Sequence, residues 1–192
     1  MSESYPKSLV SKSKDFRQKR KEILDIILYG SSVTGKARPR DLDVILLFKD
    51  LGLDRRLELA QEYKSSLKGD FPDADVKSMN LADLFDRNFL ARQGILLSGI
   101  SLLTRERICE KLGFRAYSIF SYNLKGLNHN QKTKFNYALN GRTEPGVLKS
   151  LRGISLGRGS VKVPMESSSE FGEFLDGWKV KYRKEQVLEA FY

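Results

Sequence analysis

The sequence predicts an α/β fold for the first part of the chain, followed by a small α+β extension. Three observations indicate this arrangement. Apolar runs of strand length occur at residues 23–29 and 42–48, and a stretch with helical spacing of its apolar residues follows them. The composition, 40% apolar and 30% charged, is typical of a globular protein. The length of 192 residues suits one domain or two small ones, and we expect two, residues 1–105 and a basic α+β domain of residues 106–192.

In the first domain, each expected element follows from a local pattern. The region after the second apolar run has Leu57, Ala60 and Tyr63 at helical spacing, and Gly69 and Pro72 end this helix. The elements are expected in this order: a basic helix at 11–22, strands at 23–29 and 41–48, a helix at 54–67, a strand around Asp75, a capped helix from Asn80 that leads through to Leu97, and one or two short edge strands within 94–103.

The second domain is expected to be a small strand-helix-strand unit. Ser167 and Glu170 have the spacing of a capping box, which predicts a helix start. Tyr117, Phe120 and Leu124 are spaced for the core face of a helix. The remaining expectations are a helix at 130–139 stopped at Gly141, a glycine-rich hairpin connection at 153–160, a strand at 161–163 ended by Pro164, a helix from Ser167 through Leu175 ended by Gly177, and a strand at 178–183.

Asp41 and Asp43 are the most informative residues, because they begin an apolar strand in which carboxylates need compensation by positive charge. Side chains alternate along a strand, so the two carboxylates share one face about 7 Å apart. Carboxylates placed together repel unless cations lie between them. Mg²⁺ prefers such hard oxygen ligands, and two ions can together hold a phosphoryl group in transfer. We therefore expect a third carboxylate on a neighbouring strand, namely Asp75, with Asp73 as the alternative.

A Gly30-Ser31 turn follows the first strand. Backbone amides at a helix start point outward and attract anions, so this turn is a candidate phosphate site. Lys36, Arg38 and Arg40 follow it, either as helpers in nucleotide binding or as solvated turn charges.

Taken together, these features resemble the nucleotidyltransferase superfamily that includes DNA polymerase beta. The shared pattern is an apolar strand, the Gly-Ser turn, nine residues, Asp-Leu-Asp in a second strand, and a later strand with another acid. The resemblance covers about residues 20–105 and is to the minimal, stand-alone members in particular. It implies a mixed-sheet core with helices packed on it.

The resemblance also implies an activity and its site. Gly30 and Ser31 would hold the phosphates of a nucleoside triphosphate, Asp41 and Asp43 would bind two Mg²⁺ ions, and Asp75 would bind one of them and help to deprotonate the acceptor. The implied reaction transfers a nucleoside monophosphate, AMP from ATP, to a hydroxyl and releases pyrophosphate. Minimal relatives modify small toxin proteins, whereas larger ones extend RNA ends or modify small molecules. Family members often have an arginine and a glycine shortly after the serine, where this chain has Val33, Thr34 and Gly35.

The same turn also has a competing interpretation as a degenerate phosphate loop of a nucleoside triphosphatase. Residues 30–37 read Gly-x-x-x-x-Gly-Lys-Ala after an apolar strand. However, Ala37 lacks the hydroxyl that would bind magnesium, and Pro39 interrupts the helix that should follow. We therefore rank this interpretation below the nucleotidyltransferase.

The net charge of +10 is unevenly distributed: +5 over residues 1–21, −2 over 22–104 and +7 over 105–192. Basic flanks attract polyanions, which favours an RNA acceptor, whereas the small size favours a protein acceptor. The same charge also permits a non-catalytic nucleic-acid-binding module whose acids are structural, or a role in solubility alone. In the second domain aromatic and basic residues are interleaved, as in single-stranded nucleic-acid binders: Tyr117, Phe120, Tyr122, Lys125, His129, Lys132, Lys134, Phe135, Tyr137 and Arg142.

Two classes of protein are disfavoured. No apolar run approaches the roughly 20 residues that cross a bilayer, and the N-terminus lacks a signal-peptide core, so we expect a cytoplasmic protein without a membrane partner. Cys109 is the single cysteine, which excludes an internal disulfide, and His129 is the single histidine and cannot form a metal site alone.

Overall fold

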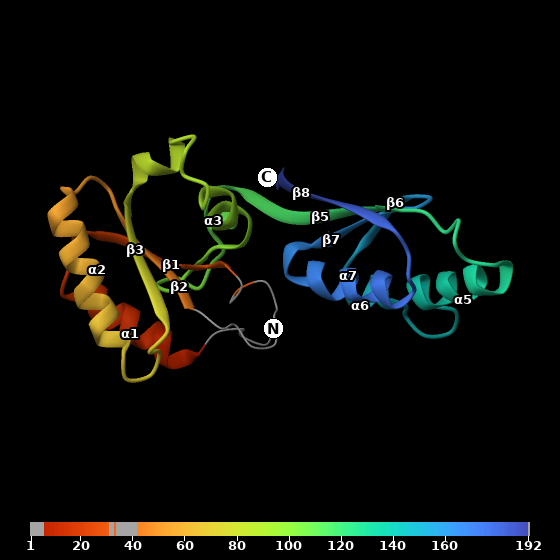
Figure 1. The fold of residues 1–192 in the computed structure, drawn as a ribbon, viewed down its shortest axis with the longest axis horizontal. Coiled ribbons are helices and arrows are strands. Elements are labelled where there is room, and N and C mark those ends of the chain that lie inside the picture. The colour runs from red at the N-terminus through yellow and green to blue at the C-terminus, as the bar shows by residue number, and fades with distance from the viewer. Residues whose placement is uncertain (1–5, 31–32, 34–41, 192) are drawn as a thin grey trace. The chain divides into compact units, whose positions relative to one another are not determined.

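The computed structural model describes residues 6–30, 33 and 42–191 of the chain. It divides into two compact units, Met1–Leu112 and Gly113–Tyr192, each with its own four-stranded sheet and core (Figure 1). Within the described residues, no helix has the length and apolar character needed to cross a membrane.

Unit 1 has a mixed sheet with the strand order β3-β2-β1-β4, which confirms the predicted fold class. β1 pairs antiparallel with β2 and β4, and β2 pairs parallel with β3. A parallel pair needs a long connection, which α2 supplies. The elements are α1 (Lys7–Gln18), β1 (Ile23–Tyr29), β2 (Leu42–Phe48), α2 (Leu53–Leu67), β3 (Ala74–Asn80), the 3-10 helix η2 (Leu81–Phe85), α3 (Arg92–Ser98), β4 (Ile100–Ser101) and α4 (Ile108–Lys111).

The sheet of unit 1 is covered on both faces, which explains why its central strands are continuous apolar runs. On one face, Val44 and Leu46 belong to a core with residues of α1 and α2. On the other face, Ile45 and Leu47 belong to a smaller core with Ile95 of α3 and Ile108 of α4. Figure 1 shows α1 and α2 together on one side of the sheet and α3 on the other. Because side chains alternate, Asp43 shares the face of Ile45, at the end of the strand.

Unit 2 has an antiparallel sheet with the strand order β6-β7-β5-β8. Its α-helices all lie on one face of that sheet (Figure 1), where Phe120, Phe135 and Phe171 are fully buried. The elements alternate in the strand-helix-strand-strand-helix-strand pattern: β5 (Phe114–Tyr122), α5 (His129–Asn140), α6 (Val147–Ser150), β6 (Ile154–Gly157), β7 (Ser160–Pro164), the 3-10 helix η3 (Met165–Ser167), α7 (Ser168–Gly177) and β8 (Tyr182–Ala190).

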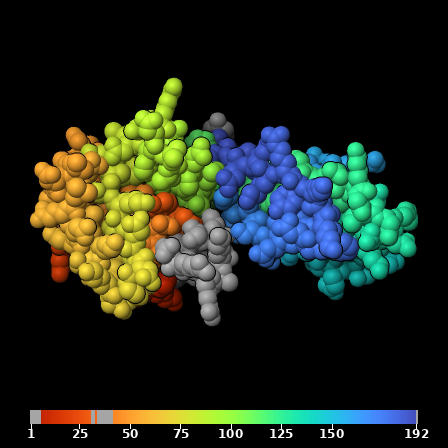
Figure 2. Space-filling model, viewed as in Figure 1, coloured from red at the N-terminus to blue at the C-terminus, as the bar shows by residue number. Residues whose placement is uncertain are grey.

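Several boundaries in unit 1 differ from the sequence prediction. The helix expected at 11–22 begins four residues earlier, at Lys7, because Leu9 and Val10 are buried in the core. The helix expected from Asn80 through Leu97 is two elements, since η2 ends at Phe85 and α3 begins only at Arg92. Residues 86–91 between them form a surface loop, which protrudes in Figure 2.

The edge strands expected within 94–103 are also largely wrong. Most of the segment before Gly99 is the helix α3, and only Ile100–Ser101 is a strand. Ile95 and Ser98 are buried three residues apart, which is a helical spacing. A Cβ at Gly99 would lie 2.4 Å from the carbonyl oxygen of Ile95, so glycine permits the close turn into the strand. Short apolar runs suit helix and strand alike, and tertiary packing decides between them.

In unit 2, the helix face expected from Tyr117, Phe120 and Leu124 is wrong, because residues 114–122 form β5. Ala116, Ser118 and Phe120 are buried in alternation, as a strand requires. The connection expected at 153–160 contains the strand β6, and the strand expected at 178–183 starts only at Tyr182 and continues to Ala190. Ser167 is the N-cap of α7 but makes no capping hydrogen bond with its side chain, so the predicted capping box is absent there.

The helix expected at 130–139 and the strand expected at 161–163 follow the prediction closely, as α5 and β7. α5 ends at Asn140 and is followed by the C-cap Gly141, whose φ of 88° is one that favours glycine, and β7 ends at Pro164. Asn128 caps α5 by accepting a hydrogen bond from the backbone amide of Gln131.

Candidate active site

Two of the predicted acidic residues lie side by side on neighbouring strands. β2 and β3 run parallel in a register that pairs Asp43 with Asp75, and both residues are half-buried. Directly paired residues project to the same face of a sheet. Asp73, the alternative third carboxylate, lies in an exposed turn before β3. The pair therefore forms the centre of the candidate site.

Gly30 brings the backbone of the predicted phosphate turn against the Asp43 carboxylate. Its φ is +78°, in the left-handed region that glycine favours. A Cβ built at this position would lie 2.3 Å from Asp43 Oδ2 and 3.2 Å from its Cγ. Tyr29, the preceding residue, pairs with Asp43 across the antiparallel β1-β2 ladder. Only glycine therefore leaves the carboxylate in this position.

Lys77 and Tyr29 also belong to this cluster, although the sequence analysis did not single them out. Lys77 Nζ lies 3.1 Å from Asp75 Oδ2. This hydrogen bond raises the pKa of the Lys77 ammonium, and the Tyr29 phenol raises it further. Burial raises the pKa of the Tyr29 phenol, and Asp43 and Asp75 add to the rise while Lys77 opposes it. Lys77 stands two residues after Asp75 in a strand, and that spacing alone places it on the same face.

A buried acid elsewhere in the same sheet shows what a structural aspartate looks like in this fold. Asp25 of β1 is 4% exposed, and its carboxylate accepts hydrogen bonds from Ser101 Oγ and Lys111 Nζ, each at 2.7 Å. The backbone amide of Ile26 donates another at 2.8 Å. Asp25 is thus neutralised inside the protein, whereas Asp43 and Asp75 both keep access to solvent.

The residues present suit a divalent cation in type and arrangement. Two carboxylates paired across parallel strands offer the hard oxygen donors that Mg²⁺ prefers. Gly30 has no Cβ, so an oxygen of the Asp43 carboxylate can lie close to the backbone of the turn. Within the described residues, no three acidic, histidine or cysteine side chains form a metal-binding group. Five predicted site residues lie outside the described residues: Ser31, Lys36, Arg38, Arg40 and Asp41.

Comparison with known proteins supports a family assignment. No curated protein matches the chain. One similar solved structure, described as "Crystal structure of the toxin-antitoxin with AMP-PNP", is 25% identical, with a TM-score of 0.38 over 54% of this chain and 78% of the other. The family model described as "Polymerase beta, Nucleotidyltransferase" matches residues 11–107, just over half of the 192-residue chain. This match spans Gly30, Asp43 and Asp75, and the chain belongs to the polymerase beta nucleotidyltransferase family.

Proposed function

We propose that the protein transfers a nucleoside monophosphate, AMP from ATP, to an acceptor hydroxyl on protein or RNA, with release of pyrophosphate. One observation carries this proposal: Asp43 and Asp75 are paired across β2 and β3, with the Asp43 carboxylate against Gly30. Neither acid is sealed inside the protein as Asp25 is. Membership of a nucleotidyltransferase family supports the same reaction class.

Asp43 and Asp75, together with Asp41, would hold Mg²⁺. When bound, the two ions would neutralise charge on the transferred phosphate and hold the attacking and leaving oxygens in line. The backbone amides of the Gly30-Ser31 turn would receive the phosphates. Lys36, Arg38 and Arg40 are further candidates for phosphate contact, since each adds a positive charge close to that turn in the sequence.

In the proposed reaction, the acceptor oxygen forms a bond to the α-phosphorus of the triphosphate. The bond from that phosphorus to the bridging oxygen of the β-phosphate breaks, and pyrophosphate leaves with the electron pair. The hydroxyl proton passes to the Asp75 carboxylate. Lys77 Nζ lies 3.1 Å from Oδ2 of that carboxylate, and we expect this contact to hold the Asp75 side chain in position. Positioning and electrostatics supply most of the acceleration in such chemistry.

The test follows the fate of two labels. The full-length protein is incubated with Mg²⁺, cell extract and ATP that carries its label in either the α- or the γ-phosphate. Transfer of a nucleoside monophosphate puts the α-label on the acceptor and the γ-label in pyrophosphate. Sensitivity of the labelled product to protease or to ribonuclease then assigns the acceptor to protein or RNA.

The variants Asp43→Asn and Asp75→Asn should each lower transfer of the α-label by about 100-fold or more, because the shape is kept and the charge is lost. Asp73→Asn is the matched control, since this exposed acid lies only two residues from Asp75 in the turn before β3, and it should retain activity. A fall with Asp73→Asn but not with Asp75→Asn would show that the third carboxylate is assigned wrongly.

Two other results would favour the competing functions. Release of the γ-label as inorganic phosphate, with no transfer of the α-label, would indicate a nucleoside triphosphatase. Absence of both transfer and Mg²⁺-dependent nucleotide binding, with nucleic-acid affinity unchanged in Asp43→Asn, would indicate a non-catalytic binding module. The Lys77–Asp75 ion pair is the observation that supports this second candidate, because it can neutralise Asp75 without a metal.

A further inference from the structure

Unit 2 contains two neighbouring surface cavities that share the residue Asn123. The larger has a volume of about 740 Å³ and lies among the end of β5, the helix α5 and the β6-β7 turn. The smaller has a volume of about 310 Å³ and lies between the residues after β5 and the segment before β8. All residues that line these cavities lie after residue 107, where the match to the family model ends.

The larger cavity has the chemistry of a site for a planar polar ring. The side chains of Asn136 and Asn140 lie one helical turn apart on α5 and line it. Among the described residues, neither side chain has a hydrogen-bond or ion-pair partner. An amide side chain offers both donors and an acceptor, which is what the edge of a nucleobase requires. Tyr122, half-buried against Phe135 at a ring distance of 5.6 Å, adds an aromatic surface.

The β6-β7 turn contributes a cation, Arg158, to the lining of this cavity. Gly159 has a φ of +73°, and a Cβ there would lie 2.4 Å from the carbonyl oxygen of Tyr122. The Tyr122 amide in turn donates to the Gly159 carbonyl oxygen at 2.7 Å. Glycine therefore lets the turn press against the end of β5, and Arg158 of this turn lines the same cavity as Tyr122.

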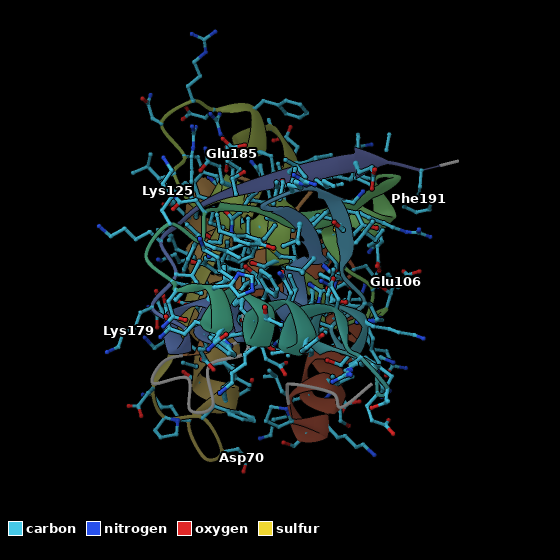
Figure 3. All side chains as sticks on the ribbon, turned by 90° about the vertical axis from the view of Figure 1, so that its right-hand side faces the viewer. Asp70, Glu106, Lys125, Lys179, Glu185 and Phe191 are labelled. Carbon is cyan, nitrogen blue, oxygen red and sulfur yellow. The ribbon has the colours of Figure 1, made fainter. Side chains whose placement is uncertain are left out.

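The smaller cavity adds three more cations. Lys125, Lys179 and Lys181 line it, and all three are exposed. No acidic side chain lines either cavity among the described residues. Figure 3 shows Lys125 and Lys179 at the same side of unit 2. Lys179 has a φ of 55°, which is unfavourable for a residue with a side chain. The local fold thus keeps a lysine where glycine would be less strained.

We propose that these two cavities form a binding site for single-stranded nucleic acid. A base enters the amide-lined cavity beside Tyr122, while the phosphates of the adjoining nucleotides lie on Arg158 and the lysines of the smaller cavity. A single strand suits the site because its bases are free to turn into a cavity, and aromatic rings and cations are the groups that hold such strands. This binding does not depend on nucleotidyl transfer.

The test is a binding titration of the full-length protein with a fluorescent single-stranded RNA of about twelve nucleotides, repeated across a salt series. The triple variant Lys125→Gln, Lys179→Gly, Lys181→Gln should bind at least about ten-fold more weakly, and the slope of log affinity against log salt should fall by about 2. Lys179→Gly relieves backbone strain, which favours folding of this variant. The double variant Asn136→Leu, Asn140→Leu should weaken binding with the salt slope unchanged, because it removes base contacts only.

The matched control removes the same charge elsewhere in unit 2, with Lys134, Lys149 and Lys184 each changed to Gln; these exposed lysines line neither cavity. It should keep most of the affinity, and equal weakening by both triple variants would overturn the proposal.

The same titration with single-stranded DNA shows whether the site prefers RNA or DNA. No binding of either strand, or equal binding of an acidic peptide of the same charge, would also overturn it. Asp43→Asn should bind RNA as the wild type does, which separates this site from the transfer reaction.

Discussion

Gly30→Ala tests the geometry of the candidate site most directly. The added Cβ would lie 2.3 Å from Asp43 Oδ2, whereas ordinary contacts begin at 3.4 Å, so the carboxylate must retreat by about 1 Å. A displacement of this size in a catalytic group costs roughly 100-fold in rate. The effect on stability should be smaller, about 1–2 kcal/mol for a side chain in the left-handed region, because a carboxylate can turn aside. We therefore expect a large loss of transfer with a modest loss of stability.

Gly113→Ala is the matched control for this variant. Gly113 has a φ of +80°, close to the +78° of Gly30, but a Cβ at Gly113 meets no atom within 4 Å. Both variants therefore carry the same backbone strain, and only Gly30→Ala displaces Asp43. The measurements are transfer of the α-phosphate label and urea unfolding curves for both proteins. If Gly30→Ala transfers the label as fast as Gly113→Ala, the carboxylate of Asp43 is not part of the reacting site.

Three further predictions concern residues around the sheet of unit 1. Lys77→Met removes the cation that competes with Mg²⁺ for Asp75. The Mg²⁺ concentration that half-saturates nucleotide binding should therefore fall by about two- to five-fold. An unchanged Mg²⁺ titration would contradict this role of Lys77. Lys111→Met leaves the buried Asp25 carboxylate without its cation and should lower the free energy of unfolding by about 3 kcal/mol in urea, with recovery when Asp25→Asn is added. Burial raises the pKa of Tyr63 from 10.0 to about 12. The folded state therefore binds this proton more tightly than the unfolded state does. Below about pH 10 this contribution to the free energy of unfolding is complete, and it should fall by about 3 kcal/mol as the pH rises to 12. Tyr63→Phe should lack this fall, and parallel pH profiles of the free energy of unfolding for the two proteins would refute the assignment.

The candidate site could be anticipated from sequence because its parts are strong local signals. An aspartate in an apolar strand, as at Asp43, is unusual, and Asp75 supplies a second acid in the strand two elements later. Both strands of the pair and the helix between them are long enough for periodicity to identify them. The family match over residues 11–107 agrees with that interpretation.

Other features depended on the packing of segments that are distant in sequence. The register that pairs Asp43 with Asp75, and the contact of Gly30 with Asp43, join residues that only the folded sheet brings together. A one-residue change of register would turn every side chain of a strand to the other face, so the buried core selects it. The sequence did not identify Lys77 as a site residue, because an exposed lysine in a strand is common.

The sequence by itself determined the alternation of strands and helices around the acidic pair, because this follows from local composition and spacing. Its resemblance to the polymerase beta nucleotidyltransferases indicated the family, which the match over residues 11–107 confirms. Tertiary structure alone decided that residues 92–98 are a helix, that residues 114–122 are a strand, and that β8 extends to Ala190. In each of these short segments the local preference is weak. For residues 92–98 and 114–122, burial of one face against a neighbouring element stabilises one conformation over the other, whereas the mostly exposed β8 is stabilised by its pairing with β5. In each case the neighbour is supplied by a distant part of the chain.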